Sequence, residues 1–175
     1  MTGAGQILAI TAAVLALLAV EAVIAARHDV RLRARGGFEA PDDVYALMRI
    51  AYPGAFLAMA IEGLLSGPAP PRLLAAGLVV FGAAKALKYW AMAALGERWS
   101  FRVIVLPEVP LVTSGPYRWL RHPNYVGVCG ELLGAALLLR APVAGVASLA
   151  AFGLLLARRI AVEERELKRG MRNEE

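Results

Sequence analysis

The chain has 175 residues, of which 59% are apolar and only 19% are charged, and its net charge is +5. A soluble domain of this length needs a largely polar surface, so the composition excludes an ordinary soluble fold and predicts an all-α integral membrane protein. The single cysteine and two scattered histidines exclude a disulfide framework and indicate no metal site. We expect residues 1–175 to form one membrane domain, with three spans over 1–95 and a loop, helical hairpin and tail over 96–175.

Apolar segments predict four or five transmembrane helices, from about Gln6 to Ala26, Val44 to Leu65, Leu73 to Leu95, Tyr125 to Leu139 and Val143 to Ile160. Each of the first three has roughly 20 residues, or about 30 Å of helix, which is enough to cross the hydrocarbon. Pro53 predicts a kink in the second helix. The last two form a shorter hairpin, which is tilted, partly interfacial, or continued beyond the lipid as amphipathic helix.

Basic residues predict the orientation. Arginines gather in residues 27–43, in residues 96–124 and in the tail from Arg158, whereas the opposite side offers only Arg72 and Arg140. With five spans, the positive-inside rule places the N-terminus outside and both the long loop and the tail in the cytoplasm. The same distribution explains the positive charge without a nucleic-acid partner.

The loop at residues 96–124, GERWSFRVIVLPEVPLVTSGPYRWLRHPN, is too long and too rich in rings to be a simple connector. Pro123 suits the first turn of a helix, where proline loses no hydrogen bond. Free backbone N–H groups near Asn124 and Tyr125 would then attract an anion.

Further side chains complement this helix start. His122 adds a donor, and Tyr117 and Trp119 add flat apolar faces. In the tail, Arg159 and Glu163 lie four residues apart and share a helix face, so Arg159 can hold an anionic group and Glu163 can accept from an amine or hydroxyls. The hairpin topology predicts that loop and tail converge on one cytosolic pocket.

Simpler interpretations stay open for these charges. The loop motif can be interfacial anchoring, and an Arg/Glu pair in the tail can be a solvated helix face. Inside the spans, charges are functional candidates by default, and ion pairing between helices is an equal alternative for Arg49, Glu62, Lys85, Lys88 and Glu131. Snorkelling by itself explains Lys88. Glu21 and His28 are interpreted as structural.

The segment LVTSGPYRWLRHPNYVG, followed by RIAVEERELK, resembles the isoprenylcysteine carboxyl methyltransferase family. The signature of that family is an RHPxYxG segment, a helical hairpin and an Arg-x-x-x-Glu-Glu-x-x-Leu tail. The resemblance covers about residues 96 to 170 and is closest to the compact bacterial branch. It implies a membrane enzyme that uses S-adenosylmethionine without a Rossmann fold, and the absence of a GxGxxG motif agrees.

The resemblance also implies roles for particular residues. The cofactor would be enclosed by Leu111, Val112, Tyr117, His122, Pro123, Asn124, Tyr125 and Glu163. Arg159 would contact the methyl acceptor. A carboxylate acceptor needs no general base, whereas a phenol or enol needs ionisation, with His122 or Glu163 as the base.

The acceptor implied is lipophilic: an isoprenylcysteine-like carboxylate, or an alkylpyrone or alkylresorcinol, since RWSFRVIVLPEVPLVTSGPYR resembles small bacterial members thought to methylate these compounds. It would enter sideways from a bacterial inner membrane, while the cofactor arrives from the cytosol. Two alternatives remain. Sterol-reductase-like proteins, which use NADPH, also carry RHPNY but continue with aromatic and acidic residues where this chain has Val126 and Val128. A non-catalytic membrane scaffold is the other.

Overall fold

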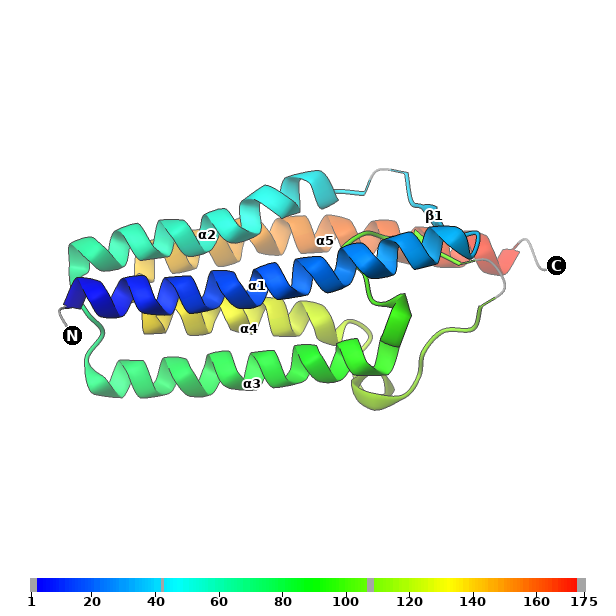
Figure 1. Cartoon of the computed structure of the whole chain (residues 1–175). Coiled ribbons are helices and arrows are strands. Elements are labelled where there is room, and N and C mark those ends of the chain that lie inside the picture. The colour runs from blue at the N-terminus through cyan, green and yellow to red at the C-terminus, as the bar shows by residue number, and fades with distance from the viewer. Residues whose placement is uncertain (1–2, 42, 107–108, 173–175) are drawn as a thin grey trace.

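Five α-helices make up most of the part of the chain that the structure describes, as the sequence predicts for an all-α membrane protein (Figure 1). The computed structural model describes residues 3–41, 43–106 and 109–172, with side chains as far as Arg165. The helices are α1 (Gly3–Ala34), α2 (Tyr45–Ser66), α3 (Pro71–Leu95), α4 (Pro123–Leu138) and α5 (Pro142–Arg172). They lie side by side, so the α1–α2 and α3–α4 connections and the end of α5 share one end of the bundle (Figure 1).

The helix bounds differ most from the predicted spans at α1, which continues past Ala26 to Ala34, and at α5, which continues past Ile160 to Arg172. α1, α2, α3 and α5 are long and apolar enough to cross a membrane. α5 has 31 residues and continues well past the apolar run, which agrees with the predicted amphipathic extension. α4 has 16 residues, or about 24 Å, and is shorter than the roughly 30 Å hydrocarbon core. Pro53 lies inside α2, which continues through it as one helix.

α4 compensates for its shortness by packing closely against α3. A side chain at Gly134 would come within 2.6 Å of the Phe81 backbone nitrogen, and one at Gly130 within 2.7 Å of the Ala84 Cβ. Glycine is therefore required at both positions. Such small residues allow helices to approach closely in a membrane, where van der Waals packing and interhelical hydrogen bonds stabilise association.

A buried ionic cluster joins the centre of the bundle. Glu21 of α1 and Glu131 of α4 face Lys85 and Lys88 of α3, with Lys88 Nζ 2.6 Å from Glu21 Oε2 and Lys85 Nζ 2.9 Å from Glu131 Oε2. The Tyr52 hydroxyl of α2 donates to Glu131 at 2.8 Å. Two carboxylates and two ammonium groups cancel, which lets charges lie where water cannot reach them.

This cluster shows which of the proposed roles the charges inside the spans have: a functional role, ion pairing between helices, or snorkelling. The Lys88 side chain is 1% exposed, so the snorkelling explanation is wrong, because its ammonium group is held inside the bundle by two carboxylates. Ion pairing between helices is the arrangement found for Lys85, Lys88 and Glu131. Glu62 instead accepts from the Val143 and Ala144 backbone N–H groups at the start of α5, at 3.1 and 2.6 Å.

The two long connections are joined at the loop end of the bundle. Strand β1 (Phe38–Glu39) pairs antiparallel with β2 (Ile104–Val105), and the loop after α3 also contains the short helices η1 (Gly96–Arg98) and η2 (Gly115–Arg118). The Arg102 guanidinium contacts both Asp29 and Glu39. His28 lies 2.8 Å from the Trp99 carbonyl oxygen, which supports its structural interpretation. The loop is thereby held over the helix ends.

Removing one charge from the central cluster should destabilise the bundle. Lys85→Met leaves the Glu21 and Glu131 carboxylates with one cation between them, so we expect the free energy of unfolding to fall by about 3–5 kcal/mol. Adding Glu21→Gln restores neutrality and should recover a large part of that loss. Unfolding in mixed micelles measures both variants, and the exposed Arg72→Gln is the control. If Lys85→Met alone proved as stable as the Arg72→Gln control, the cluster would not have the stabilising role assigned to it.

Candidate active site

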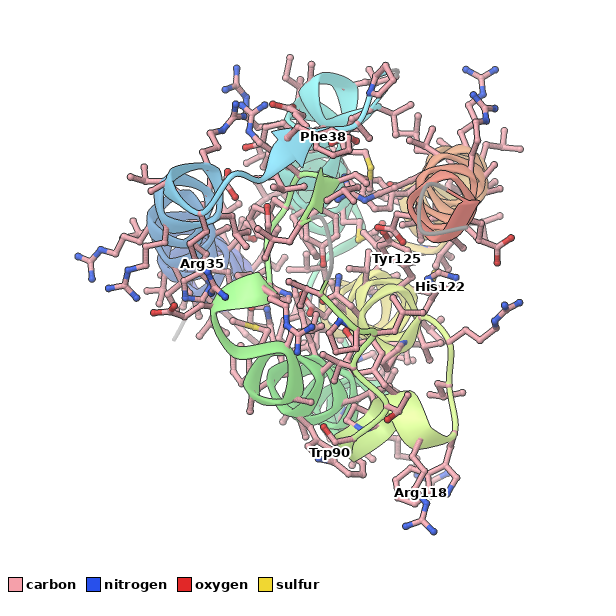
Figure 2. All side chains as sticks on the ribbon, turned by 90° about the vertical axis from the view of Figure 1, so that its right-hand side faces the viewer. Arg35, Phe38, Trp90, Arg118, His122 and Tyr125 are labelled. Atoms are coloured by element: carbon pink, nitrogen blue, oxygen red, sulfur yellow. The ribbon has the colours of Figure 1, made fainter. Side chains whose placement is uncertain are left out.

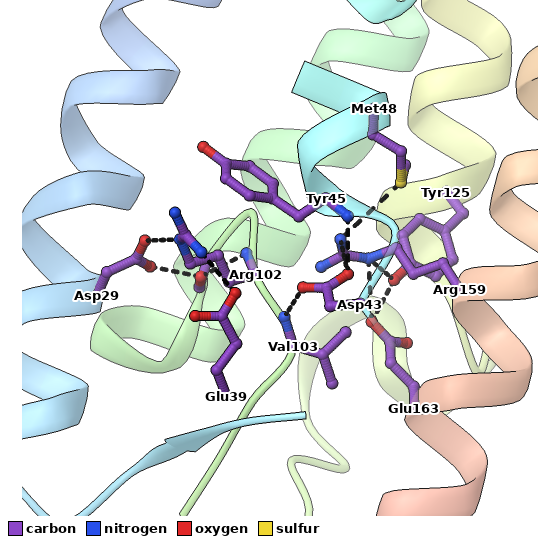
Figure 3. Close-up of polar contacts among 11 residues, drawn as sticks. Asp29, Glu39, Asp43, Tyr45, Met48, Arg102, Val103, Tyr125, Arg159 and Glu163 are labelled. Carbon is purple, nitrogen blue, oxygen red and sulfur yellow. Dashed lines mark hydrogen bonds and ion pairs between the residues drawn. The ribbon is translucent and has the colours of Figure 1, made fainter. Parts of the chain in front are cut away.

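Arg159 of α5 lies at the centre of a polar cluster at the loop end (Figure 3). Its side chain is only 5% exposed, and its Nε donates to the Tyr125 hydroxyl at 2.8 Å. Its Nη1 lies 3.2 Å from Asp43 Oδ1, and Nε lies 3.5 Å from Glu163 Oε1. The Tyr125 hydroxyl in turn donates to Glu163. The four-residue spacing on α5 therefore gives a buried network rather than a solvated helix face.

His122 extends this network towards the solvent. Its ring stacks on Tyr125 with centroids 5.5 Å apart, and its Nδ1 lies 3.4 Å from Glu163 Oε2. The hydrogen bond with Glu163 is the main reason that the pKa of His122 is raised above its ordinary value, and burial opposes it. Burial raises the pKa of Tyr117 to about 12, with a further contribution from Glu163, so this phenol keeps its proton.

Figure 2 looks at the bundle from this end and shows His122 and Tyr125 between α4 and α5. The sequence explains their position. His122 precedes the first turn of α4, which Pro123 begins with a fixed φ and without needing a hydrogen-bond partner for its nitrogen. The first turn of α4 therefore lies beside Arg159 and Glu163 of α5.

A cavity of about 790 Å³ opens beside this cluster, within the range of known ligand sites. Eight of the nine predicted site residues line it: Leu111, Val112, Tyr117, His122, Asn124, Tyr125, Arg159 and Glu163. Pro123 does not line it, because its ring is buried at the start of α4. The loop and the tail therefore converge, as the hairpin topology predicts.

The cavity changes character along its length. Its deep end is lined mainly by apolar and aromatic side chains, Leu15 and Leu18 of α1, Tyr52 of α2 and Phe152 of α5, and by Lys88 of α3, whose charge is paired with Glu21 and Glu131. The rings of Tyr52 and Phe152 lie 5.0 Å apart there. From Phe152 to Glu164, α5 rises about 18 Å along the cavity wall. One cavity thus joins a polar, loop-covered end to an apolar end inside the bundle.

Two details of the predicted site are wrong. The Tyr125 N–H is not free, because the first turn of α4 is tight and this group donates to the His122 carbonyl at 3.1 Å. Trp119 does not face the cavity. Helix η2 packs against α3, which leaves Trp119 67% exposed with its ring 5.7 Å from that of Trp90.

Sequence reasoning missed Asp43 and Trp99. The Asp43 carboxylate accepts from the Tyr45 N–H at 3.1 Å and the Val103 N–H at 2.8 Å while facing Arg159, so it connects the start of α2, the long loop and α5 (Figure 3). An aspartate just before a helix is a recognisable capping signal. Trp99 is 1% exposed and lines the cavity, with Nε1 3.4 Å from Asn124 Oδ1. No local pattern predicts that contact.

Asp43 should be essential for holding the start of α2, the long loop and α5 together at the loop end of the bundle. Asp43→Ala leaves the buried Arg159 guanidinium without one carboxylate, so we expect a loss of about 3–5 kcal/mol in the free energy of unfolding. Faster hydrogen exchange at the Val103 amide should accompany it. Asp43→Asn keeps an acceptor oxygen and should lose less. The control is Glu97→Ala, whose pair with Arg31 is exposed and contributes little. Equal stability of the alanine variant and this control would contradict the role of Asp43.

Comparisons with known proteins identify the family of the chain. The chain is 30% identical to the uncharacterized protein YpbQ of Bacillus subtilis (strain 168), over 86% of this chain and 89% of that protein. It is 29% identical to an uncharacterized protein of Haemophilus influenzae, over 87% of this chain and 90% of that protein. No solved structure matches significantly. The profile of the isoprenylcysteine carboxyl methyltransferase (ICMT) family matches residues 75–169, more than half of the chain and including α4 and most of α5, so this protein belongs to that family.

Proposed function

We propose that this protein is a membrane-embedded, S-adenosylmethionine-dependent O-methyltransferase that acts on a carboxylate or hydroxyl group of a lipophilic acceptor. Membership of the family supports methyl transfer. The observation that carries the proposal is the single cavity with a polar end formed by the motif residues and an apolar end inside the bundle. Such a cavity suits one polar and one lipophilic ligand.

The polar end fits the cofactor by its chemistry. S-adenosylmethionine supplies a methyl group on a positively charged sulfonium. Glu163 offers a carboxylate, and Tyr117 and Tyr125 offer ring faces, and both kinds of group stabilise a cation. Asn124 adds an amide with both donor and acceptor atoms, and Leu111 and Val112 close the same end. Pro123 would act indirectly, by setting the start of α4.

Arg159 would orient the acceptor. Asp43 and Tyr125 hold two sides of its guanidinium, so its direction is set before a ligand arrives. In methyl transfer the protein mainly positions two reactants, and a fixed donor beside the cavity serves that purpose. A hydroxyl acceptor would also need to lose its proton, and His122 or Glu163 lies close enough to Arg159's network to take it.

The membrane placement is part of the proposal. Most basic residues lie at the loop end, with Arg72 and Arg140 at the other. The positive-inside rule then puts the loop end and C-terminus in the cytoplasm and the N-terminus outside, in a bacterial inner membrane. The cofactor would arrive from the cytosol and the acceptor from the bilayer.

The central experiment separates the enzyme classes. Detergent-purified protein should bind S-adenosylhomocysteine and not NADPH. Incubation with methyl-labelled S-adenosylmethionine and a bacterial lipid extract should yield a labelled lipid, which mass spectrometry identifies. Binding of NADPH instead would indicate a reductase-like protein, and binding of neither would indicate a scaffold.

Two variants should separate cofactor and acceptor roles. His122→Ala removes a charged contact of Glu163 at the polar end, so we expect about a tenfold weaker affinity for S-adenosylhomocysteine. Arg159→Lys keeps the charge facing Asp43 but loses the planar fork. It should leave that affinity nearly unchanged and raise KM or lower kcat. Calorimetry and initial rates measure these effects. The same response from both variants would refute the division of roles.

The raised pKa of His122 predicts a pH dependence. The His122–Glu163 contact stabilises the fold fully below the ordinary histidine pKa of about 6.5, and this contribution is lost as pH rises through the raised value. A protonated His122 repels a sulfonium but not the neutral sulfide of S-adenosylhomocysteine. Affinity for S-adenosylmethionine relative to S-adenosylhomocysteine should therefore increase as pH rises, and His122→Gln should abolish the trend. A trend that persists in this variant would assign it to another group.

A further inference from the structure

The short helix η2 ends in an exposed arginine and an exposed tryptophan at the outer side of α3. Trp119 directly follows η2 and is 67% exposed, and its ring lies 5.7 Å from that of Trp90 of α3, which is 48% exposed. The Arg118 guanidinium lies 5.7 Å from the centre of the Trp119 ring. Figure 2 shows Trp90 and Arg118 on this side, with Arg118 directed away from the bundle. We call Trp90, Arg118 and Trp119 the tryptophan–arginine hook.

Gly115 holds the hook against α3. Its φ of +58° lies in the left-handed region, and a Cβ there would come within 2.9 Å of the Ala94 Cβ and 3.3 Å of the Trp90 Nε1. The loop backbone therefore approaches the end of α3 more closely than a residue with a side chain would allow. Pro116, the next residue, is almost completely buried. The exposure of Trp119 thus results from a closely packed turn.

The hook lies at the depth where a membrane-spanning helix leaves the hydrocarbon. α3 is one of the helices long and apolar enough to cross a membrane, and the exposed Arg72 lies near its start. From Arg72 to Trp90 the helix rises about 27 Å, which is close to the roughly 30 Å of a hydrocarbon core. With Arg72 at one interface, Trp90 and Trp119 lie at the other. Tryptophan is enriched at this depth, because its ring is apolar and its N–H group reaches water.

The cation of the hook is unmatched. No carboxylate among the described residues pairs with the Arg118 guanidinium, whereas Arg121 pairs with Glu164 at 3.5 Å. The exposed side chains that follow it along the chain include the apolar Leu120 and Val126. A guanidinium can bind a phosphate group through two parallel hydrogen bonds. An unpaired arginine beside apolar and aromatic side chains therefore suits a ligand with a phosphate and a hydrocarbon part.

We propose that the tryptophan–arginine hook binds an anionic phospholipid of the leaflet at the loop end of the bundle. Arg118 pairs with the phosphate of the headgroup, while Trp90 and Trp119 pack beside the upper part of the acyl chains. A zwitterionic lipid also has a phosphate, but its ammonium group cancels the charge, so an anionic lipid is preferred. This lipid binds outside the cavity and is not a reactant, so the site does not depend on methyl transfer.

The same short helix connects this lipid site to the cavity. Tyr117 of η2 lines the cavity, whereas the next two residues belong to the hook. The Tyr117 N–H donates to the Ser114 carbonyl and the Trp119 N–H donates to the Pro116 carbonyl, each at 3.2 Å. A lipid that holds Arg118 and Trp119 therefore also stabilises these two hydrogen bonds, and with them the position of Tyr117.

Brominated lipids test the site, because bromine quenches tryptophan fluorescence at short range. The protein with Trp90→Phe is reconstituted in vesicles of phosphatidylcholine and phosphatidylglycerol. Bromine is carried by only one of the two lipids, either near the headgroup or near the end of the acyl chain. Adding Trp119→Phe gives the background from Trp99, which is 1% exposed. Arg118→Gln tests the charge, and Arg72→Gln is the matched control, since it removes an exposed arginine at the other end of α3.

We expect bromine near the headgroup to quench Trp119 more than bromine at the chain end, and brominated phosphatidylglycerol to quench it more than brominated phosphatidylcholine. Arg118→Gln should lower the preference for phosphatidylglycerol about fivefold, and Arg72→Gln should leave it unchanged. Equal quenching by the two lipids, or a preference that survives Arg118→Gln, would overturn the proposal. Quenching of Trp119 by neither lipid would also overturn it, because water or a second copy of the chain would then cover the hook.

Hydrogen exchange measures the effect of the lipid on η2. Exchange of the Tyr117 and Trp119 amides should be about fivefold slower in vesicles that contain phosphatidylglycerol than in pure phosphatidylcholine, and Arg118→Gln should abolish the difference. Equal rates in the two vesicles would contradict the stabilisation of η2. Neither measurement uses a cofactor or an acceptor. A protein that binds lipid at the hook but binds no S-adenosylhomocysteine would therefore overturn the methyltransferase proposal and support the lipid site.

Discussion

The buried guanidinium of Arg159 is the interaction on which the functional end depends. A charge that is almost completely removed from water must be paired, because its desolvation costs several kcal/mol. Its partners come from three separate parts of the chain: Asp43 before α2, Tyr125 at the start of α4 and Glu163, which follows Arg159 by one turn of α5. Pairing the Arg159 guanidinium therefore fixes the start of α2, the start of α4 and α5 relative to one another. These three elements contribute to the wall of the cavity.

Two groups of buried charges have different roles in this bundle: one joins the helices, and the other borders the cavity. The cluster of Glu21, Lys85, Lys88 and Glu131 is balanced internally and joins helices at mid-depth, so it serves the packing of α1, α3 and α4. The Arg159 network lies nearer the loops and borders the cavity. Lys88 of the central cluster and the neighbouring Tyr52 line the deep end of the cavity. Residues of the Arg159 network line its polar end. Ion pairs at mid-depth and at the loop end thus hold the helices around the cavity, without a large soluble domain.

The amphipathic cavity also explains why the two long connections are joined to each other. The β1–β2 pair and the contacts of Asp43 with Val103 hold residues 96–122 over the helix ends. This cover lies over the polar end of the cavity, while Leu15 and Leu18 of α1 and Phe152 of α5 line its other end inside the bundle. A reaction between a water-soluble cofactor and a lipid requires such a meeting point, since neither reactant is soluble where the other resides.

The sequence by itself determined the membrane character, the first three helices, the hairpin and the convergence of loop and tail. These follow from hydropathy, from the prolines that begin helices and from spacing along one helix, all of which are local. The resemblance of its motifs to a known family also pointed to eight residues of the cavity wall. Only the tertiary structure decided that Lys88 is buried, that Trp119 faces away and that Asp43, Trp99 and Arg49 belong to the cavity. Each of these depends on a partner, or on the lack of one, far away in the chain. Local pattern carries no information about such pairings, because they arise only when helices pack.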